Sequence, residues 1–359
     1  MPAVVGVVAV PFSKGATPMT LTLSPHSTTT DSQTVRRRLS GFKPTGRLHL
    51  GNYLGAIRPM LDAVTNSGEV ESVIMVADLH ALTVEHDPQR LRSLTTEMLA
   101  TLLACGFDET SIYVQSDVPE HAELHYLLEC ATGYGEAARM VQFRERAAGT
   151  EPVRLSLLTY PVLMAADILL HDAAEVPVGE DQTQHLELAR DVANRFNTRY
   201  GRTFTVPRAV YPPIGARVMD LADPTGKMGK SSLSDSGRIY LLDKPDLVRR
   251  KVGRAVTDGH GEVVYDRERR PAISNLVEIL AACERDDPKT AAARFSSYVE
   301  LKEALAEAIV DTLAPIQRRY AEFINDRGYL DTVRRRGAEL VRDRASRTVT
   351  RAKQAIGLQ

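Results

Sequence analysis

Residues 40–53 read SGFKPTGRLHLGNY and contain the clearest structural signal in this chain of 359 residues. An apolar lead-in precedes a turn with Pro44 and Gly46, and the stretch then runs into a helical pattern. This order predicts a strand, a tight loop and a helix N-terminus. The unpaired N–H groups of such a terminus suit an anion, typically a phosphate, and Gly51 allows a ligand to approach the backbone. Taken alone, the loop also fits an ordinary strand-to-helix turn.

A second informative segment, KMGKSS at residues 227–232, follows a Pro–Thr–Gly turn far downstream. Lys227 and Lys230 stand three positions apart in a loop of small residues, so their ammonium groups can converge on one polyanion. A solvated basic loop is the alternative interpretation, and for a single K-x-x-K sequence it is the more common one. The segment becomes specific only together with residues 40–53.

Strand and helix patterns alternate from Leu39 onward. Asp87 and Pro88 have the form of an N-cap and first helical residue, and Gly106 is placed to end that helix after Cys105. Apolar strand patterns occur at residues 72–76, 111–115 and 176–178, and helical patterns at residues 88–105, from Pro119 onward and at 161–170. This alternation predicts an α/β fold with a parallel sheet, whose ligands bind at the C-terminal ends of the strands.

Helical patterns replace strands after about Pro224. They cover residues 245–256, 271–285, 290–301, 303–327 and 330–356. The last of these is amphipathic and basic. A solvated helix face is the simplest interpretation of its arginines.

The overall composition is that of a globular protein, with 43% hydrophobic and 25% charged residues and a net charge of −1. Contacts with nucleic acid would therefore depend on a local basic patch. Cys105, Cys130 and Cys283 are scattered without metal-binding spacing, which predicts buried free thiols in a reducing compartment and no metal site. No apolar run has membrane-spanning length. Residues 1–35 are predicted to be a disordered extension, or the product of a mis-annotated start codon.

The segments HLGN and KMGKS together resemble the two signature motifs of class I aminoacyl-tRNA synthetases, usually written HIGH and KMSKS. Three further stretches are similar to bacterial-type tryptophanyl-tRNA synthetases. They are DLHALTV at residues 78–84, LTYPVLMAAD at 158–167 and VPVGEDQTQHLELARDVANRFN at 176–197. The resemblance runs from about Leu39 to the C-terminus, with the motifs in the order of the family.

This resemblance implies a Rossmann-like catalytic domain at residues 36–223 and an α-helical anticodon-binding domain at residues 224–359. It also implies an insertion at about 82–155 that supplies the interface of a homodimer. The implied activity is that of a cytoplasmic tryptophan–tRNA ligase. L-Tryptophan reacts with ATP to form tryptophanyl-adenylate, and the acyl group passes to tRNA(Trp). Mg²⁺ would accompany ATP, held by phosphate oxygens and waters. The helical domain makes an RNA-facing role plausible for part of the basic tail.

The resemblance also implies roles for individual residues. Lys227, Lys230, His49 and Asn52 are the expected catalytic residues. The expected ATP-binding residues are Lys43, Thr45, Gly51, Asn52, Arg146, Gly179, Asp181, Gln182, Val218, Lys227, Met228, Lys230 and Ser231. The expected tryptophan-binding residues are Leu39, His80, Tyr160, Met164, Asp167, Val176, Val178 and Gln182. Asp167 would accept the indole N–H. A satisfied core aspartate and a structural histidine are the alternatives for Asp167 and His80.

Three positions depart from the family pattern. Leu39 replaces an aromatic residue, Gly229 replaces the serine of the second signature, and Lys43 stands where many bacterial members have glutamine. None of them removes a group that the chemistry requires. Two other functions stay open at this point: a tyrosyl-tRNA synthetase, and a synthetase-like paralogue that binds a nucleotide or a partner without charging tRNA.

Overall fold

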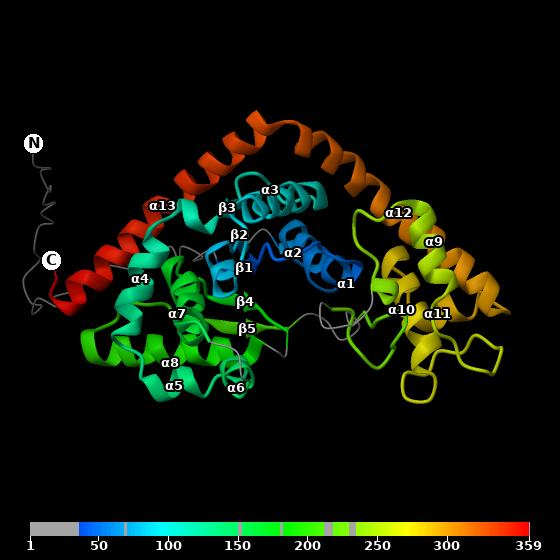
Figure 1. The fold of residues 1–359 in the computed structure, drawn as a ribbon, viewed down its shortest axis with the longest axis horizontal. Helices are drawn as coiled ribbons and strands as arrows, with labels where there is room; N and C mark the ends of the chain where they lie inside the picture. Colours follow the sequence, from blue (N-terminus) through cyan, green and yellow to red (C-terminus); the bar gives the residue numbers. More distant parts are fainter. Residues whose placement is uncertain are drawn as a thin grey trace, which may run out of the picture. The chain divides into compact units, whose positions relative to one another are not determined.

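Within the described residues, five parallel strands form one sheet in the order β3-β2-β1-β4-β5 (Figure 1). The strands are β1 (Arg36–Phe42), β2 (Val70–Val76), β3 (Ile112–Val114), β4 (Glu175–Pro177) and β5 (Arg208–Val210). The computed structural model describes residues 36–67, 70–149, 153–179, 182–211, 218–229 and 235–358. The predicted extension at residues 1–35 lies outside them. The predicted α/β fold with a parallel sheet is confirmed.

Helices connect the strands and cover both faces of the sheet. Between β1 and β3 they are α1 (Leu50–Asn52), the π-helical turn η1 (Tyr53–Ile57), α2 (Arg58–Ser67), the 3₁₀ turn η2 (Leu79–Thr83) and α3 (Pro88–Cys105). Between β3 and β5 they are η3 (Gln115–Asp117), α4 (Glu120–Glu129), α5 (Tyr134–Ala138), α6 (Val141–Ala147), α7 (Leu155–Leu170) and α8 (Thr183–Tyr200). After β5 follow η5 (Asp235–Gly237), α9 (Pro245–Gly253), α10 (Pro271–Glu284), α11 (Pro288–Ala292), α12 (Tyr298–Asn325) and α13 (Arg327–Ile356).

The core lies in two apolar clusters, one on each face of the sheet. Along β2, Ile74 and Val76 belong to one cluster, while Val73 and Met75 belong to the other. This follows from the period of two in a strand, which sends successive side chains to opposite faces. The first cluster adds residues from α3 and from α9 to α12, and the second adds residues from α4, α7 and α8. Burial on both faces explains why these strands read as continuous apolar runs.

The predicted bounds of α3 are confirmed at both ends. The Asp87 carboxylate accepts a hydrogen bond from the Arg90 N–H at 2.7 Å, and Pro88 is the first helical residue. Gly106 ends the helix with φ of 114°, a left-handed conformation that favours glycine. The predicted start of α7 at Pro161 is wrong. That helix begins six residues earlier, at Leu155, and continues through the proline.

The predicted division of residues 290–327 is also wrong. The break between the two helices lies at residues 293–297: α11 ends at Ala292 and α12 begins at Tyr298. Ser297 is the N-cap of α12, and its hydroxyl accepts from the Glu300 N–H at 3.3 Å. No break occurs near residue 302.

Helix α13 runs from the end of α12 back past β3 to α4 (Figure 1). Some of its basic side chains are exposed, among them Arg335 and Arg347, but others are not part of a solvated face. Instead they pair with acids around the sheet: Arg334 with Asp117, Arg344 with Glu71 at 2.6 Å, Arg351 with Asp172 at 2.9 Å and Lys353 with Glu123 at 3.1 Å. The expectation of a solvated face is therefore wrong for these four residues, whereas the RNA-facing role expected for part of the helix stays a prediction.

A close backbone contact holds α13 against β3. A Cβ atom on Gly337 would lie 2.0 Å from the Ile112 carbonyl oxygen and 3.2 Å from the Tyr113 Cα. Both are backbone atoms of β3, so a larger residue at position 337 requires the helix or the strand to move. Glycine is needed here because two main chains approach each other.

We expect Gly337→Ala to lower the free energy of unfolding by about 1–3 kcal/mol, the usual cost of overpacking a buried contact. Urea denaturation measures this loss. Gly328→Ala is the matched control on the same helix, because a Cβ atom there has its nearest neighbour at 3.7 Å, an ordinary contact. The control should be neutral or stabilising. Equal stability of the wild type and Gly337→Ala would contradict the packing described for α13.

The insertion at about residues 82–155 stays a prediction, and that range includes one strand of the sheet. Strand β3 lies inside that range, yet it pairs with β2 through Ile74, Met75 and Val76. Strand β3 is therefore part of the Rossmann-like sheet, and the described residues from η3 to α6 add no further strand to it. The proposed division into residues 36–223 and 224–359 does not separate two cores. Leu102 of α3, Val248 of α9 and Ile309 of α12 share one cluster.

The cysteine prediction holds in part. Cys105 is buried and Cys283 half-buried, and burial raises the pKa of Cys105 to about 12 and of Cys283 to about 11. Cys130 is exposed at the end of α4, so its predicted burial is wrong. In the part of the chain that the structure describes, no helix has the length and apolar character needed to cross a membrane. Nor does that part contain a cluster of three or more side chains suited to bind a metal.

Candidate active site

The loop after β1 forms the first part of the candidate site, at the C-terminal edge of the sheet. His49 is the N-cap of α1. The Asn52 N–H donates to His49 Nδ1 at 3.3 Å, and the His49 N–H donates to Asn52 Oδ1 at 3.0 Å. This reciprocal capping box fixes both side chains at the start of the helix. The position lies near the switch point of the sheet, where β1 pairs with β2 on one side and with β4 on the other.

The two signature segments are in contact. A Cβ atom on Gly51 would lie 3.5 Å from the Met228 Cβ and 3.1 Å from His49 Nδ1. The backbone after the second segment pairs with the first. Leu50 N–H donates to the Ile239 carbonyl at 2.7 Å, and Leu241 N–H donates to the Leu48 carbonyl at 3.0 Å. Segments separated by about 180 positions in the sequence therefore form one structural unit.

Helix α10 and the strand-like backbone at residues 218–219 anchor the second segment. Met228 N–H donates to the Val218 carbonyl at 3.0 Å, and both side chains are buried. Asn275 of α10 binds both backbone groups of Met219, at 3.0 and 3.2 Å. Lys227 is exposed above this anchor. Lys230 and Ser231 lie outside the described residues. A Cβ atom on Gly229 would meet only the Lys227 carbonyl, at 3.5 Å, so nothing described there excludes the serine of the family.

Asp167 is the centre of a buried polar network. Its Oδ2 accepts from His80 Nε2 at 2.7 Å, and its Oδ1 accepts from Gln115 Nε2 at 2.7 Å and His121 Nδ1 at 2.6 Å. Burial alone would raise the pKa of Asp167, but the hydrogen bonds from His121 and His80 outweigh it and hold that pKa well below its ordinary value. The carboxylate is therefore ionised, and each of its three neighbours must donate.

The network continues away from the site through Tyr113 and His171. Tyr113 Oη lies 3.0 Å from His121 Nε2 and 2.7 Å from His171 Nε2. Burial holds the pKa of His171 well below its ordinary value, so this imidazole is neutral. With His121 donating from Nδ1, a consistent arrangement has Tyr113 donating to His121 and accepting from His171. His171 Nδ1, which has no hydrogen-bond partner, is then left as an acceptor. The network thus fixes which nitrogen of His121 carries the proton toward Asp167.

One face of α7 carries the other predicted tryptophan-binding groups. Tyr160, Met164 and Asp167 have helical spacing, and the first two are half-buried. Tyr160 Oη donates to Gln142 Oε1 at 2.9 Å and lies 2.6 Å from His185 Nε2; burial raises its pKa to about 12, which keeps it protonated. The His80 and Tyr160 rings meet edge to face at 6.3 Å. The remaining predicted wall residues, all buried in one apolar cluster, are Leu39, Val176 and Val178.

The other predicted ATP-binding residues are more dispersed. Lys43 Nζ donates to Thr83 Oγ1 at 3.1 Å, and this hydroxyl donates to the His80 carbonyl at 3.0 Å, so Lys43 stabilises the turn that carries His80. Thr45 is exposed in the loop after β1. Gln182 N–H donates to the Gly179 carbonyl at 3.0 Å, at the end of β4. Arg146 is exposed on α6. Asp181 lies outside the described residues.

The sequence interpretation missed two residues of the network, Gln115 and His121. Gln115 is fully buried directly after β3, and its Oε1 also accepts from the Leu79 N–H at 3.1 Å. A polar residue at the C-terminal end of an apolar strand was a signal that could have identified it. His121, also fully buried, gave no comparable signal, because it follows Pro119 in a helix N-terminus with several polar residues.

Comparisons with known proteins agree with the site described above. The family model described as tRNA synthetases class I (W and Y) matches residues 32–314. The "Tryptophan--tRNA ligase 1" of Streptomyces avermitilis is 52% identical over 330 residues, covering 90% of this chain and 99% of that protein. A protein of the same description from Streptomyces coelicolor is 54% identical over 330 residues, covering 90% and 98%.

Solved structures are similar over the same extent. Tryptophanyl-tRNA synthetase from Mycoplasma pneumoniae has a TM-score of 0.82 and 34% sequence identity, covering 90% of this chain and 98% of that chain. The enzyme from Campylobacter jejuni, solved in complex with ADP and tryptophan, has a TM-score of 0.77 and 31% identity, covering 90% and 100%. A tyrosyl-tRNA synthetase from Archaeoglobus fulgidus, at 20% identity and a TM-score of 0.64, shares the fold.

Proposed function

Since this chain belongs to the family of class I tRNA synthetases for tryptophan and tyrosine, we propose that it activates L-tryptophan with ATP and transfers it to tRNA(Trp). The observation that carries the choice of amino acid is the identity of 52% and 54% to proteins named tryptophan–tRNA ligase, over almost their whole length. The contact between the two signature segments supports the assignment, because the residues proposed for ATP come from both.

In the first step the tryptophan carboxylate attacks the α-phosphorus of ATP, and pyrophosphate leaves. Negative charge builds on the phosphate oxygens, so the enzyme needs positive charge and positioning more than a general base. Lys227 and Lys230 supply this charge. The backbone next to Lys227 is held by Val218 and α10. The ammonium group can therefore bind the phosphates with a small loss of conformational entropy.

The first signature segment binds the nucleotide from the other side. His49 and Asn52 are oriented by their capping box, and Gly51 leaves the space next to the His49 ring open for the base. Thr45, Arg146, Gly179, Asp181, Gln182 and Ser231 complete the ATP contacts that we assign, with Val218 and Met228 as the apolar floor. Mg²⁺ arrives with ATP as part of the substrate, bound mainly by phosphate oxygens and waters.

Tryptophan binds along α7. Asp167 accepts the indole N–H, and Met164, Leu39, Val176 and Val178 surround the ring. Tyr160, His80 and Gln182 bind the ammonium and carboxylate end. Because Asp167 is ionised and can only accept, tryptophan gains a hydrogen bond from its indole N–H that phenylalanine cannot form, which favours tryptophan.

The remaining assignments follow from the proposed reaction. The enzyme acts in the cytoplasm as a homodimer, with the insertion at about residues 82–155 at the interface. The helical part after residue 224 binds the tRNA. Lys43 acts indirectly, by holding the turn that carries His80.

ATP–pyrophosphate exchange with tryptophan and with tyrosine tests the proposed amino acid. We expect exchange with tryptophan to exceed exchange with tyrosine by at least about a hundredfold in kcat/KM, the discrimination typical of a site with a dedicated hydrogen-bonding group. Charging of tRNA(Trp) and rescue of a strain lacking its tryptophanyl enzyme test the second step. Exchange with tyrosine alone would reassign the substrate. Exchange without charging or rescue would favour the synthetase-like paralogue.

A further inference from the structure

A pocket lies between the loop after β1, the segment that follows the second signature, and α9. Arg47 contributes from the loop, Asp235 and Tyr240 from the segment, Arg250 and Lys251 from α9, and Arg254 from the C-cap of α9. Arg250 and Arg254 are four residues apart, so they occupy the same side of the helix. The pocket therefore joins α9 to the loop that contains the first signature.

The acidic groups of this pocket already have partners. Buried Lys251 donates from Nζ to Asp243 Oδ2 at 2.7 Å and to the Arg238 carbonyl at 2.6 Å. Asp235 Oδ1 accepts from Tyr240 Oη at 2.8 Å and lies 3.5 Å from Arg238. These contacts satisfy the charges at the base and rim of the pocket within the protein.

Three arginines of the pocket have no such partner. Arg47, Arg250 and Arg254 are exposed, and none of their side chains forms a hydrogen bond or ion pair within the part of the chain that the structure describes. All three residues line one concave surface, and they carry positive charge that the neighbouring acids do not neutralise. A guanidinium presents its N–H donors in a planar fork that matches two oxygens of a phosphate.

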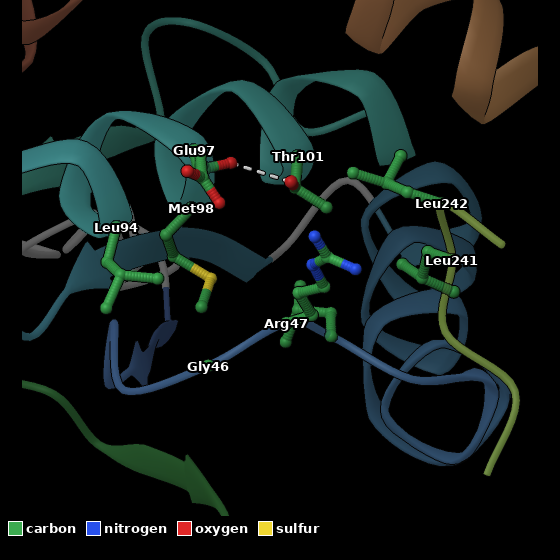
Figure 2. Close-up of a pocket in the computed structure, with 9 residues that line it drawn as sticks. Gly46, Arg47, Leu94, Glu97, Met98, Thr101, Leu241 and Leu242 are labelled. Atoms are coloured by element: carbon green, nitrogen blue, oxygen red, sulfur yellow. Dashed lines mark hydrogen bonds between the residues drawn. The ribbon is translucent and has the colours of Figure 1, made fainter. Parts of the chain in front are cut away.

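A second hollow that Arg47 also lines does not suit an anion. Figure 2 shows a small hollow where the Arg47 side chain extends between Thr101 of α3 and Leu241. The lining there is mostly apolar, and Glu97 adds a carboxylate. An anion that approaches Arg47 is therefore favoured on the side of α9, where Arg250 and Arg254 reinforce its field.

We propose that Arg47, Arg250 and Arg254 bind phosphates of the sugar–phosphate backbone of the tRNA substrate. This inference rests on the proposed function. The net charge of the chain is −1, so an RNA ligand must find a local cationic surface. Four basic residues of α13 are already paired with acids around the sheet, whereas the three arginines of the pocket are not. Tyr240 forms a β-bridge with His49, so RNA bound here lies beside the signature segments.

The test is the double substitution Arg250→Ala/Arg254→Ala, which changes two exposed residues on a helix surface where alanine is well tolerated. We expect KM for tRNA(Trp) in aminoacylation to rise at least about tenfold, because two charge-assisted contacts are lost. The slope of log KM against log salt concentration should decrease by about 1.5, at about 0.7–0.9 per phosphate contact. ATP–pyrophosphate exchange with tryptophan should stay within about twofold of the wild type.

The matched control is Arg92→Ala/Arg202→Ala, which also removes two exposed arginines but lies outside the pocket lining and outside the helical part after residue 224. It should leave KM for tRNA(Trp) nearly unchanged. Equal effects of the two double variants would show that any loss of two positive charges weakens tRNA binding, and would overturn the proposal. A parallel loss of exchange would assign the arginines to ATP or pyrophosphate instead, and an unchanged KM for tRNA would exclude an RNA contact. Failure of the proposed function differs from all three, because the wild type itself would then not charge tRNA(Trp).

Discussion

Replacing Asp167 with asparagine lowers kcat/KM for tryptophan in ATP–pyrophosphate exchange by at least about a hundredfold, equivalent to about 2.7 kcal/mol of transition-state stabilisation. Three neighbours donate to the carboxylate: His80, Gln115 and His121. An asparagine side chain has one acceptor oxygen and one donor group, so its NH₂ must face one of these donors. The indole N–H then competes for an acceptor that is partly lost. Discrimination between tryptophan and phenylalanine should fall in the same experiment.

The same substitution should lower the free energy of unfolding by about 3 kcal/mol, because a buried charged acceptor is removed from its partners. Activity must therefore be normalised to the folded fraction at low temperature. Tyr113→Phe is the matched control. It removes the hydroxyl between His121 and His171, deeper in the network, and leaves Asp167 with all three donors. We expect this variant to lose stability but to keep its selectivity for tryptophan.

These two variants separate a substrate role of Asp167 from a structural one. If Asp167→Asn retains the wild-type preference for tryptophan over phenylalanine among folded molecules, another acceptor reads the indole. If Tyr113→Phe loses selectivity to the same degree, the network as a whole sets the shape of the pocket and Asp167 has no separate role. Measuring both variants under one condition distinguishes the outcomes.

Local chemistry made much of the fold predictable. The helix that begins after Asp87 and ends at Gly106 has an N-cap, a proline at the first position and a left-handed glycine. Each of these signals acts only on the helix turn next to it. A local signal was also overlooked. Ser297 and Glu300 have the spacing of a capping box, and the structure begins α12 there. The break predicted near residue 302 neglected this pair.

Contacts between distant segments could not be predicted in the same way. Gln115 and His121 reach Asp167 across 52 and 46 positions, and only the packing of β3 and α4 against α7 brings them together. The basic residues of α13 illustrate the same limit. Their pattern predicts a solvated face, but Glu71 and Asp172 lie where the helix crosses the sheet and neutralise them. Neither acid is close to α13 in the sequence.

Replacing Lys227 with alanine lowers the rate of adenylate formation by about a hundredfold, while the affinity for tryptophan in the absence of ATP stays nearly unchanged. The physical reason is that an ammonium group stabilises charge that develops only as pyrophosphate leaves, and removal of one such group costs about 10²–10³ in rate. The fold should tolerate the change, because Lys227 is exposed and its β-bridge to Met219 uses backbone atoms only. Rapid-quench measurement of adenylate formation gives the rate, and equilibrium dialysis gives the tryptophan affinity.

The matched control is Lys244→Ala, which changes an exposed lysine at the start of α9 and should alter neither quantity. Lys230→Ala should behave as Lys227→Ala does, since the two lysines act on the same phosphates. A weakened affinity for tryptophan at an unchanged rate would instead place Lys227 in ground-state binding, and its assignment to the transition state would be wrong.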